Sequence, residues 1–525
     1  MPWEPKPRNQ LKTNLKLKHL YPWSFISLAW LFLCGFIVQG FILANFFSFT
    51  DQPINLEVLN PIIGSVSFGI GSMLVASILG TTLAIYFECY QRDKSPFLKY
   101  LFALPLAFPI YVFSFIYVGA FEYSSFLSTS FRSIGLDLPS VRNILGASLI
   151  TGLCLYPYVF LIVTAHLRVV FPKYYWVSKS LGLNDLQTIV KVLLPALAPS
   201  ILAGAMLVLF ESLADFGAVK TFGIETLTTS IYSQWFGMQD YIGGSRLALI
   251  LLAVVVGFIY LQKLLSKETN IQKIKTTSNI ALISGSKIFG AAVLVIGFFA
   301  IAFPFAQLIL WAEPTQVIKE FWVNNIFLNS LLLAFVGGLL VLILGLAIAF
   351  ANLQKSKYNR FVNLTTYGYA LPGSVIAVAI MVGFQISFNV SLTDLGLIGL
   401  ILALSIRFLT PAKNYATRSL SLIPKSSIYS LALNNSGSIK SFIEFYWKHI
   451  RLTSLLVFFI VAIEILKEQP AVLLLRPAGF DTLSSRIYNY TSEGQWELAA
   501  QPSILLVFIG VIFVIMLTRI QDHYE

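Results

Sequence analysis

Four carboxylates lie inside segments of the chain that are otherwise apolar. Glu211 and Asp215 are four residues apart, and Glu464 and Glu468 repeat this spacing later in the chain. On a continuous helix, residues at this spacing share one face. Hard cations prefer oxygen ligands, so four carboxylates around an axis that relates two halves would suit the passage of such a cation.

Acidic side chains at membrane depth cost roughly 2.5–3.5 kcal/mol each on insertion scales, so they normally face a bundle interior or a water-filled cavity. A second interpretation places the four carboxylates near an interface, as helix-end groups or in ion pairs with Lys467 or Lys220. Because a tight site would trap a transported ion, we expect no high-affinity metal site here.

Motifs for catalysis are missing from the sequence. It contains no GxxxxGK[ST] loop to hold phosphates, no cluster of His and carboxylates spaced for metal-dependent hydrolysis, and only four His in total. We therefore expect that the chain is no enzyme and binds no cofactor, and that its energy comes from a partner or an ion gradient.

The composition is that of an all-α polytopic membrane protein. Hydrophobic residues make up 57% of the chain and charged residues only 11%, against roughly 25% charged in soluble domains. The net charge of +12 is distributed over loops, so no nucleic-acid partner is expected. Cys34, Cys89 and Cys154 are scattered, which indicates neither a disulfide framework nor a zinc site.

About twelve segments are apolar enough, over about 20 residues, to cross a lipid bilayer. The predicted spans are 23–47, 61–86, 100–121, 144–165, 200–219, 245–265, 288–312, 328–351, 363–387, 395–416, 453–474 and 500–518. If the N-terminus is cytoplasmic, 27 of the 36 Lys and Arg residues fall on the cytoplasmic side and 8 on the other. This bias predicts that both termini are cytoplasmic, with lipid around the bundle.

The two halves of the chain repeat each other at nearly constant offsets. Six spans per half predict two parallel repeats related by an axis along the membrane normal, with a pathway between them. The expected divisions are 1–59 (N-terminus, first span and external loop), 60–265 (first core half), 266–287 (cytoplasmic linker), 288–327 (seventh span and external loop) and 328–520 (second core half). Matching pairs include Ile78-Leu79-Gly80 with Ile343-Leu344-Gly345, Glu211 with Glu464, and Thr226-Leu227 with Thr482-Leu483.

A polar, basic stretch at residues 174–195 separates two long apolar runs. Gly182 permits a turn, and Asn184 with Gln187 forms a capping-box pattern, so we expect two short helices at an angle. The second copy, residues 427–451, has Ala432 in place of Gly182 and lacks the Leu194-Pro195 ending. Either stretch could instead be an ordinary amphipathic loop at the membrane surface.

The spacing of Gly182, Val192 and Leu194-Pro195 resembles the cytoplasmic loop of ABC importer permeases, although Trp176, Val177 and Ser178 replace its opening Glu-Ala-Ala. Residues 210–251 resemble the fifth span and the following external loop of ferric-iron-type ABC permeases, in which two six-span halves are fused. The matching motifs are Asp215-Phe216-Gly217, Phe222-Gly223, Thr228-Thr229 with Ile231-Tyr232, Trp235-Phe236-Gly237 and, earlier, Tyr156-Pro157-Tyr158.

This resemblance implies a type I ABC importer permease in the bacterial inner membrane, which translocates ferric iron. It implies as partners two copies of a cytoplasmic ATPase, which binds the ATP and Mg, and an external iron-binding protein. The implied ATPase-coupling residues are Ser178, Gly182, Asn184, Leu194 and Pro195, with Ala432 and Asn434 in the second copy. The hypothetical iron pathway is lined by Glu211, Asp215, Glu464, Glu468, Tyr156 and Tyr158.

Several alternatives stay open at this point. Arg407 pairs with an acidic residue or snorkels to the cytoplasmic interface, and we favour snorkelling. Tyr156 and Tyr158 are expected to pack, although a Tyr hydroxyl is an oxygen donor for ferric iron. Other ABC permeases carry thiamine, phosphonate or polyamines, and an ion-coupled secondary transporter would use intramembrane carboxylates as coupling sites.

Overall fold

The computed structural model describes residues 21–49, 58–90, 101–265, 287–313, 325–353, 362–363, 365–388, 392–423 and 448–524, with the single positions 315 and 446. In this part of the chain all regular structure is helical, and no strand occurs. The predicted all-α membrane fold is therefore confirmed. The linker 266–286 and the residues Ala432 and Asn434 lie outside the described residues.

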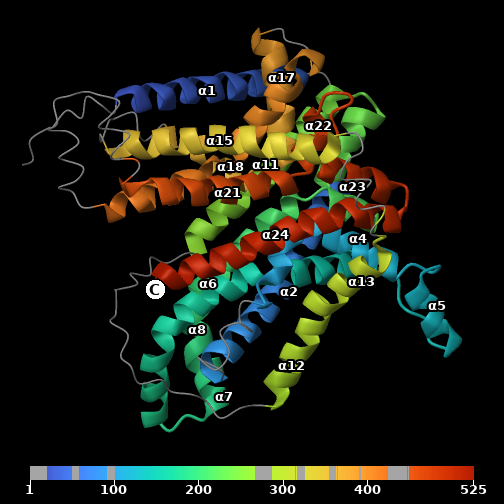
Figure 1. Ribbon diagram of the computed structural model, residues 1–525, viewed down its shortest axis with the longest axis vertical. Helices are drawn as coiled ribbons and strands as arrows, with labels where there is room; N and C mark the ends of the chain where they lie inside the picture. The colour runs from blue at the N-terminus through green and yellow to red at the C-terminus, as the bar shows by residue number, and fades with distance from the viewer. Residues whose placement is uncertain are drawn as a thin grey trace, which may run out of the picture.

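In the first half α2, α4 and α8 pack around α6, whereas α1 lies beside α15 and α17 (Figure 1). Helices α2, α6 and α8 pack on one another, because each presents buried apolar or small residues to the other two. The elements are α1 (Tyr21–Phe49), α2 (Leu59–Ile85) with η4 (Tyr86–Tyr90), η5 (Leu104–Ala107), α4 (Ile110–Ala120), α5 (Phe126–Ser133), α6 (Ile144–Ser180), α7 (Asp185–Thr188) with η6 (Ile189–Leu193), α8 (Leu194–Ala214), α9 (Gly217–Phe222), α10 (Leu227–Tyr232) with η7 (Ser233–Gly237), and α11 (Tyr241–Leu265).

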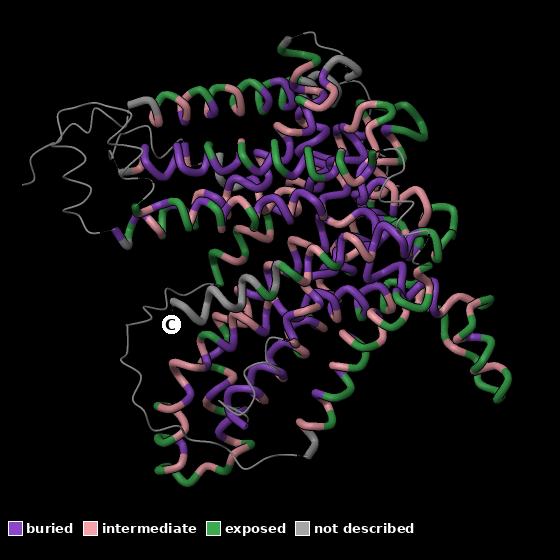
Figure 2. The backbone as a smooth tube through the Cα atoms, in the orientation of Figure 1, coloured by how far each residue is buried: buried purple, intermediate pink, exposed green. Residues whose placement is uncertain are grey.

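The second half repeats this plan, with α15, α18 and α21 as its packed trio. Its elements are α12 (Lys287–Gly297), η8 (Phe298–Ala302), α13 (Phe303–Trp311), α15 (Ile326–Leu353), η10 (Thr365–Ala370), α17 (Gly373–Phe388), α18 (Leu392–Leu422), α21 (Arg451–Lys467), α22 (Pro470–Leu475), α23 (Leu483–Ser492) and α24 (Trp496–Tyr524). Buried positions gather where the two halves meet (Figure 2).

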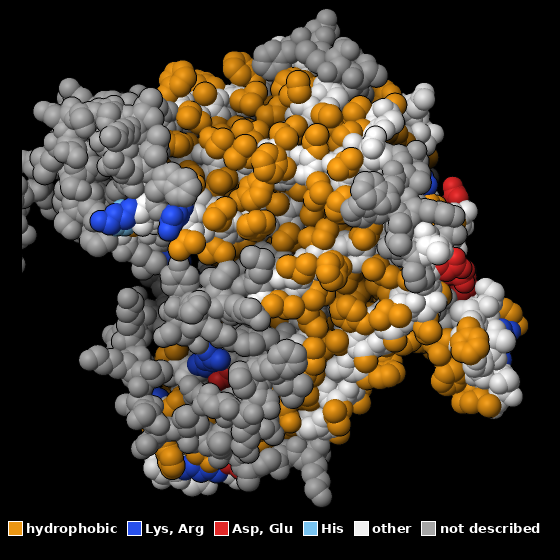
Figure 3. All heavy atoms as spheres, viewed as in Figure 1, with side chains coloured by type: hydrophobic (Ala, Val, Ile, Leu, Met, Phe, Trp, Pro, Cys, Tyr) orange, Lys and Arg blue, Asp and Glu red, His pale blue; other side chains and the backbone are white. Residues whose placement is uncertain are grey.

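Each predicted span overlaps at least one helix. Eight helices in the described part are long and apolar enough to cross a membrane, and shorter apolar helices occur at Ile110–Ala120, Gly373–Ser387 and Trp496–Ile512. Apolar side chains cover the face shown in Figure 3, as expected for contact with lipid.

Four predicted spans, 100–121, 200–219, 363–387 and 453–474, are wrong as continuous helices. The chain bends at Pro109 before α4 and at Pro372 before α17, and it leaves the helix at Asp215 and Glu468. Proline lacks the amide proton that a helix interior needs, and it forces the preceding residue out of the helical region. These four breaks all lie near the centre of the molecule.

The first helix of each half packs against the other half. Helix α1 contacts α15 and α17 of the second half, and α13 contacts α4 of the first half as well as α24 of its own half. Gly40 and Gly383 permit the contact between α1 and α17, because a Cβ on Gly40 would lie 2.8 Å from the Cα of Gly383. The two halves are thus interlocked rather than merely adjacent.

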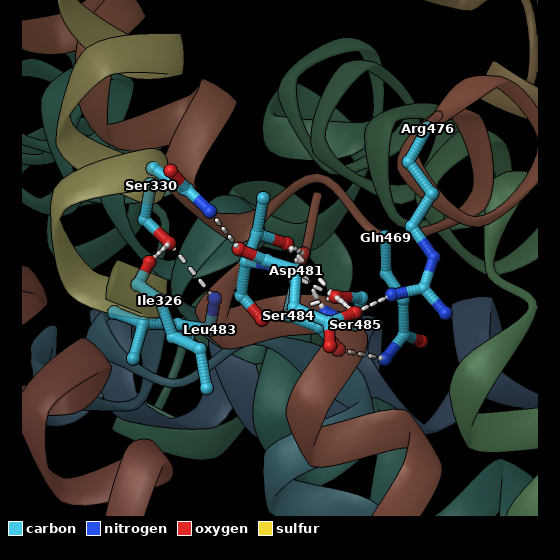
Figure 4. Close-up of polar contacts among 10 residues, drawn as sticks. Ile326, Ser330, Gln469, Arg476, Asp481, Leu483, Ser484 and Ser485 are labelled. Atoms are coloured by element: carbon cyan, nitrogen blue, oxygen red, sulfur yellow. Dashed lines mark hydrogen bonds and ion pairs between the residues drawn. The ribbon is translucent and has the colours of Figure 1, made fainter. Parts of the chain in front are cut away.

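Both halves fix the segment that follows α8 or α21 with the same buried hydrogen bond. The Leu227 amide donates to Ser65 Oγ over 2.8 Å, and the Leu483 amide donates to Ser330 Oγ over 2.8 Å. The second of these bonds is drawn in Figure 4. Thr226 and Thr482, one residue earlier, each form a capping box. The same hydrogen bond and the same capping box thus occur at matching positions of the two halves, as the internal repeat predicted from sequence requires.

Removing either serine should destabilise the fold measurably. Ser330→Ala or Ser65→Ala leaves a buried amide without its acceptor, which costs about 1–3 kcal/mol. We expect each variant to lower the midpoint of thermal unfolding of the purified protein. Ser77→Ala is the matched control, because the Ser77 hydroxyl bonds only within its own helix, to the Met73 carbonyl. Equal midpoints for Ser65→Ala and Ser77→Ala would contradict the prediction.

Candidate functional site

One cavity between the two halves receives all four predicted carboxylates. It has a volume of about 80 Å³. Glu211 and Asp215 reach it from the end of α8, and Glu464 and Glu468 reach it from the end of α21. The structure thus brings together two pairs that are separated by about 250 residues in sequence, as their shared spacing predicted.

The prediction that each pair shares one helix face is wrong. Helix α8 ends at Ala214, and Asp215 has the extended angles φ −72° and ψ 141°. Helix α21 ends at Lys467, and Glu468 has φ −67° and ψ 124°. Only Glu211 and Glu464 are helical, so the members of each pair play different structural roles.

Asp215 and Glu468, here called the capping pair, hold the backbone of the next helix. Asp215 Oδ1 accepts a hydrogen bond from the Ala218 amide over 2.7 Å, and Glu468 Oε1 accepts one from the Ala471 amide over 3.4 Å. Their own carbonyls accept bonds from the hydroxyls of Thr228 and Ser484, respectively, over 2.8 and 2.9 Å. These residues are therefore bound into the turns that close the helices.

Glu211 and Glu464, here called the open pair, are held only by side chains. Glu211 Oε1 accepts a hydrogen bond of 2.9 Å from the Tyr369 hydroxyl, which the other half contributes through η10. Glu464 Oε1 lies 4.0 Å from Lys467 Nζ, and its side chain is 27% exposed. With no backbone donor on them, these two carboxylates are held less firmly than the capping pair.

Arg407 is buried in the cavity wall, so the prediction that it snorkels to the interface is wrong. Its side chain is 9% exposed, and its Nε lies 3.2 Å from Glu468 Oε2. Its position in the repeat corresponds to Pro157, so the first half offers no matching cation. A buried guanidinium needs a carboxylate close by, which explains why it sits beside Glu468 rather than at the membrane surface.

Lys467 ties the second half to the first. Its Nζ donates a hydrogen bond of 2.8 Å to the Leu106 carbonyl, in the turn that precedes α4. Lys467 and Arg407 also line the cavity, which therefore carries four formal negative charges and two positive ones. The net formal charge of the lining is −2. The second interpretation, in which the carboxylates form ion pairs with Lys467, is thus confirmed for Glu464. The pair lines a cavity, however, rather than an interface.

The two predicted tyrosines occupy different environments. Tyr158 lines the cavity, whereas Tyr156 is fully buried and donates a hydrogen bond of 2.9 Å to the Phe102 carbonyl. Tyr156 is therefore a packing residue. The sequence analysis missed Tyr111, which lines the cavity, and Tyr369. Both tyrosines reach the cavity through contacts between segments that are distant in sequence. For Tyr111 the sequence offered one signal, its position two residues after Pro109, where the predicted span breaks. For Tyr369 it offered none.

No tight metal site is visible. Within the described ranges, no group of three or more His, Cys, Asp or Glu side chains is close enough together to hold a metal ion. The cavity is also far smaller than the roughly 300–1,000 Å³ of ordinary small-molecule sites, and it has room for a few water molecules. Its chemistry is that of a small cavity with an acidic lining.

The predicted coupling residues of the first copy lie beyond the end of α8 that is opposite the carboxylates, about 30 Å away along a helix of this length (Figure 1). The capping box is confirmed: Asn184 Oδ1 accepts from the Gln187 amide over 2.8 Å, and Gln187 Oε1 accepts in return from the Asn184 amide. Gly182 has the positive φ of 75° that its turn requires.

The prediction of two separate short helices here is wrong. Helix α6 runs without interruption to Ser180. Ser178, two residues earlier, is buried, and its hydroxyl donates a hydrogen bond to the Tyr174 carbonyl. After the turn, α7 continues through a π-helical turn into Leu194 and Pro195 at the start of α8. The segment still presents an exposed apolar surface, made by Trp176, Val177, Leu181, Leu186 and Val190.

The chain resembles known permeases. The family described as the inner membrane component of binding-protein-dependent transport systems matches residues 80–271. The Fe(3+)-transport system permease protein FbpB 2 of Haemophilus influenzae is 26% identical over 465 residues, which cover 84% of this chain and 86% of the relative. The ferric transport system permease protein FbpB of Actinobacillus pleuropneumoniae is 25% identical over 480 residues, covering 84% and 68%.

A shorter match concerns a different cargo. The sulfate transport system permease protein CysT of Salmonella typhimurium is 27% identical over 164 residues, which cover 31% of this chain and 56% of the relative. The helical fold, the internal repeat and these similarities agree. Residues 80–271 are thus similar to the inner membrane components of binding-protein-dependent transport systems, and the relatives that match most of the chain are named as transport permeases.

Proposed function

We propose that this chain forms the whole transmembrane pathway of an ATP-driven importer for ferric iron. An external solute-binding protein delivers the iron, and a cytoplasmic ATPase dimer supplies the energy. The observation that carries the proposal is the acidic cavity between the halves, with a net formal charge of −2. Two relatives that each match 84% of this chain are named as ferric permeases, which agrees with this chemistry.

The charge and the volume of the cavity favour some cargoes over others. An acidic lining repels sulfate or phosphonate and attracts cations, so the similarity to a sulfate permease does not extend to its cargo. Thiamine and polyamines are also cations, but a cavity of about 80 Å³ fits a small ion better than an organic molecule. Carboxylate and phenol oxygens suit a hard cation such as ferric iron.

The open pair would contact the ion only transiently. Glu211 and Glu464 keep side-chain partners, Tyr369 and Lys467, that can take the carboxylates back after the ion has left. Binding that is too tight would stop transport, so a weak site agrees with this role. The capping pair would contribute charge without moving.

The ATPase would act on the permease through the turn between α6 and α7. ATP and Mg bind to the ATPase, and this chain needs no cofactor of its own. The exposed apolar surface around Gly182 is what the ATPase would contact, and the second copy near Ala432 and Asn434 would contact the other ATPase subunit. In this proposal the turn and both termini would face the cytoplasm, which the distribution of Lys and Arg supports.

The cargo can be tested in a strain that lacks the gene. Energy-dependent uptake of radioactive ferric iron should fall in the deleted strain and return when the gene is restored, whereas thiamine and sulfate uptake should not change. Restored thiamine or sulfate uptake without an effect on iron would keep the permease and reject the iron cargo.

Substitutions of Gly182 test the coupling turn. Gly182→Trp should lower both iron uptake and copurification of the ATPase, because no atom lies within 4 Å of the Cβ position and a new side chain would project toward the partner. Gly182→Asn is the control, because asparagine tolerates a positive φ and is small. Membrane insertion should be normal in both variants. Normal copurification of the ATPase with Gly182→Trp would contradict the proposed contact.

A further inference from the structure

Residues 121–143, here called the α5 hairpin, extend away from the helix bundle. Helix α5 stands off the body of the molecule beside the ends of α4 and α13, at the opposite end from α7 (Figure 1). The hairpin joins the end of α4 at Ala120 to the start of α6 at Ile144. Since both helices belong to predicted membrane spans, the hairpin begins and ends at a membrane interface.

The hairpin places polar side chains inside and apolar ones outside. A pocket of about 240 Å³ lies within it, and six of its eleven lining residues are charged residues or serines: Glu122, Ser128, Arg132, Asp137, Ser140 and Arg142. In contrast, Phe126 is 89% exposed, Ile134 is 70% exposed and Leu136 is 55% exposed. Large exposed apolar side chains that gather in one segment mark a contact with a membrane or another protein.

Helix α5 is amphipathic in the same sense. At 100° per residue, Phe126, Leu127, Phe131 and Ile134 fall within an arc of about 140°. Ser128 and Arg132 lie on the opposite side, where both line the pocket. Ser125 caps the helix by accepting a hydrogen bond of 3.1 Å from the Ser128 amide. On the apolar side of this helix Leu127 and Phe131 are half-buried, whereas Phe126 and Ile134 are not covered by the described part of the chain.

The apolar side continues the surface that faces lipid. Leu145 and Leu149 at the start of α6 are 77% and 57% exposed, and Leu310 at the end of α13 is 77% exposed. In the space-filling view the hairpin presents apolar atoms on the same face of the molecule as the apolar belt of the bundle (Figure 3). This continuity favours lipid as the occupant.

We propose that the α5 hairpin is an interfacial anchor that lies in the outer part of the bilayer. Phe126 and Ile134 enter the region where headgroups meet acyl chains, the position that amphipathic helices and aromatic rings occupy. Arg132 and Arg142 lie at the height of the lipid phosphates. The anchor would hold the ends of α4 and α6 at a fixed depth, and this inference does not depend on the identity of the cargo.

Single spin labels in nanodiscs of phosphatidylethanolamine and phosphatidylglycerol test the proposal. In a chain whose three cysteines are replaced by alanine, Phe126→Cys and Ile134→Cys carry the probes. Thr129→Cys is the control, since Thr129 is exposed but lies on the polar side of α5. We expect the labels at 126 and 134 to collide with oxygen and to lose collisions with a water-soluble nickel chelate, and the label at 129 to show the reverse.

Equal nickel access at positions 126, 129 and 134 in nanodiscs would overturn the proposal. It would also be overturned if the label at 126 were open to nickel in lipid and became shielded only when the solute-binding protein was added. That second result would make the hairpin a protein-docking surface.

Discussion

Replacing Glu211 and Glu464 together with glutamine is expected to lower ferric iron uptake about tenfold or more at equal expression. The change removes both carboxylates of the open pair and brings the net formal charge of the cavity lining from −2 to zero. A loss of about 1.4 kcal/mol in the interaction with the passing cation corresponds to a factor of ten. Uptake of radioactive iron into cells, normalised to the amount of permease in the membrane, is the measurement.

The capping pair supplies the matched control for this prediction. Asp215→Asn removes one charge, as Glu464→Gln does, but asparagine caps a helix about as well as aspartate. We therefore expect the loss with Glu464→Gln to exceed the loss with Asp215→Asn. Equal losses would mean that only the net charge matters, and unchanged uptake in the Glu211→Gln, Glu464→Gln variant would exclude the cavity as a cation pathway.

Breaking the pair between Arg407 and Glu468 should produce the largest loss of stability. Glu468→Gln leaves a buried guanidinium without its carboxylate at 3.2 Å, and removal of one partner of a buried ion pair costs about 3–5 kcal/mol. The expected result is a large fall in the thermal unfolding midpoint in detergent, with reduced amounts of folded permease in membranes.

A second substitution separates the ion pair from other effects. Arg407→Met in the Glu468→Gln background removes the orphaned charge and should restore most of the stability. Glu464→Gln is the comparison, because the pair of Glu464 with Lys467 is longer, at 4.0 Å, and more exposed, so its loss should cost about 1 kcal/mol or less. Similar midpoints for Glu468→Gln and Glu464→Gln would contradict the role assigned to Arg407.

Local patterns in the sequence were sufficient for much of the fold. Long apolar segments predicted the helices, and the Asn184 and Gln187 capping box involves residues only three apart. The repeat of Glu211 at Glu464 predicted that the carboxylates would meet, because equivalent positions of two parallel repeats face a common axis.

The details of the site depend on contacts between distant segments. Helix α8 ends at Asp215 with help from the Thr228 hydroxyl, 13 residues later, and Tyr369 reaches Glu211 across 158 residues. Hydropathy reports whether a segment is apolar, so it did not distinguish a continuous span from one that breaks at its centre. It also did not distinguish an arginine paired inside the bundle from one that snorkels, because both leave Arg407 in an apolar segment.

The most direct test of the central claim is transport by the reconstituted importer. Proteoliposomes would contain this chain and its ATPase, with ATP inside and the solute-binding protein loaded with radioactive ferric iron outside. We predict iron entry that requires all three proteins and ATP, with no response to an imposed proton or sodium gradient. Iron entry driven by such a gradient without the ATPase, or no iron entry from a complex that hydrolyses ATP, would contradict the account.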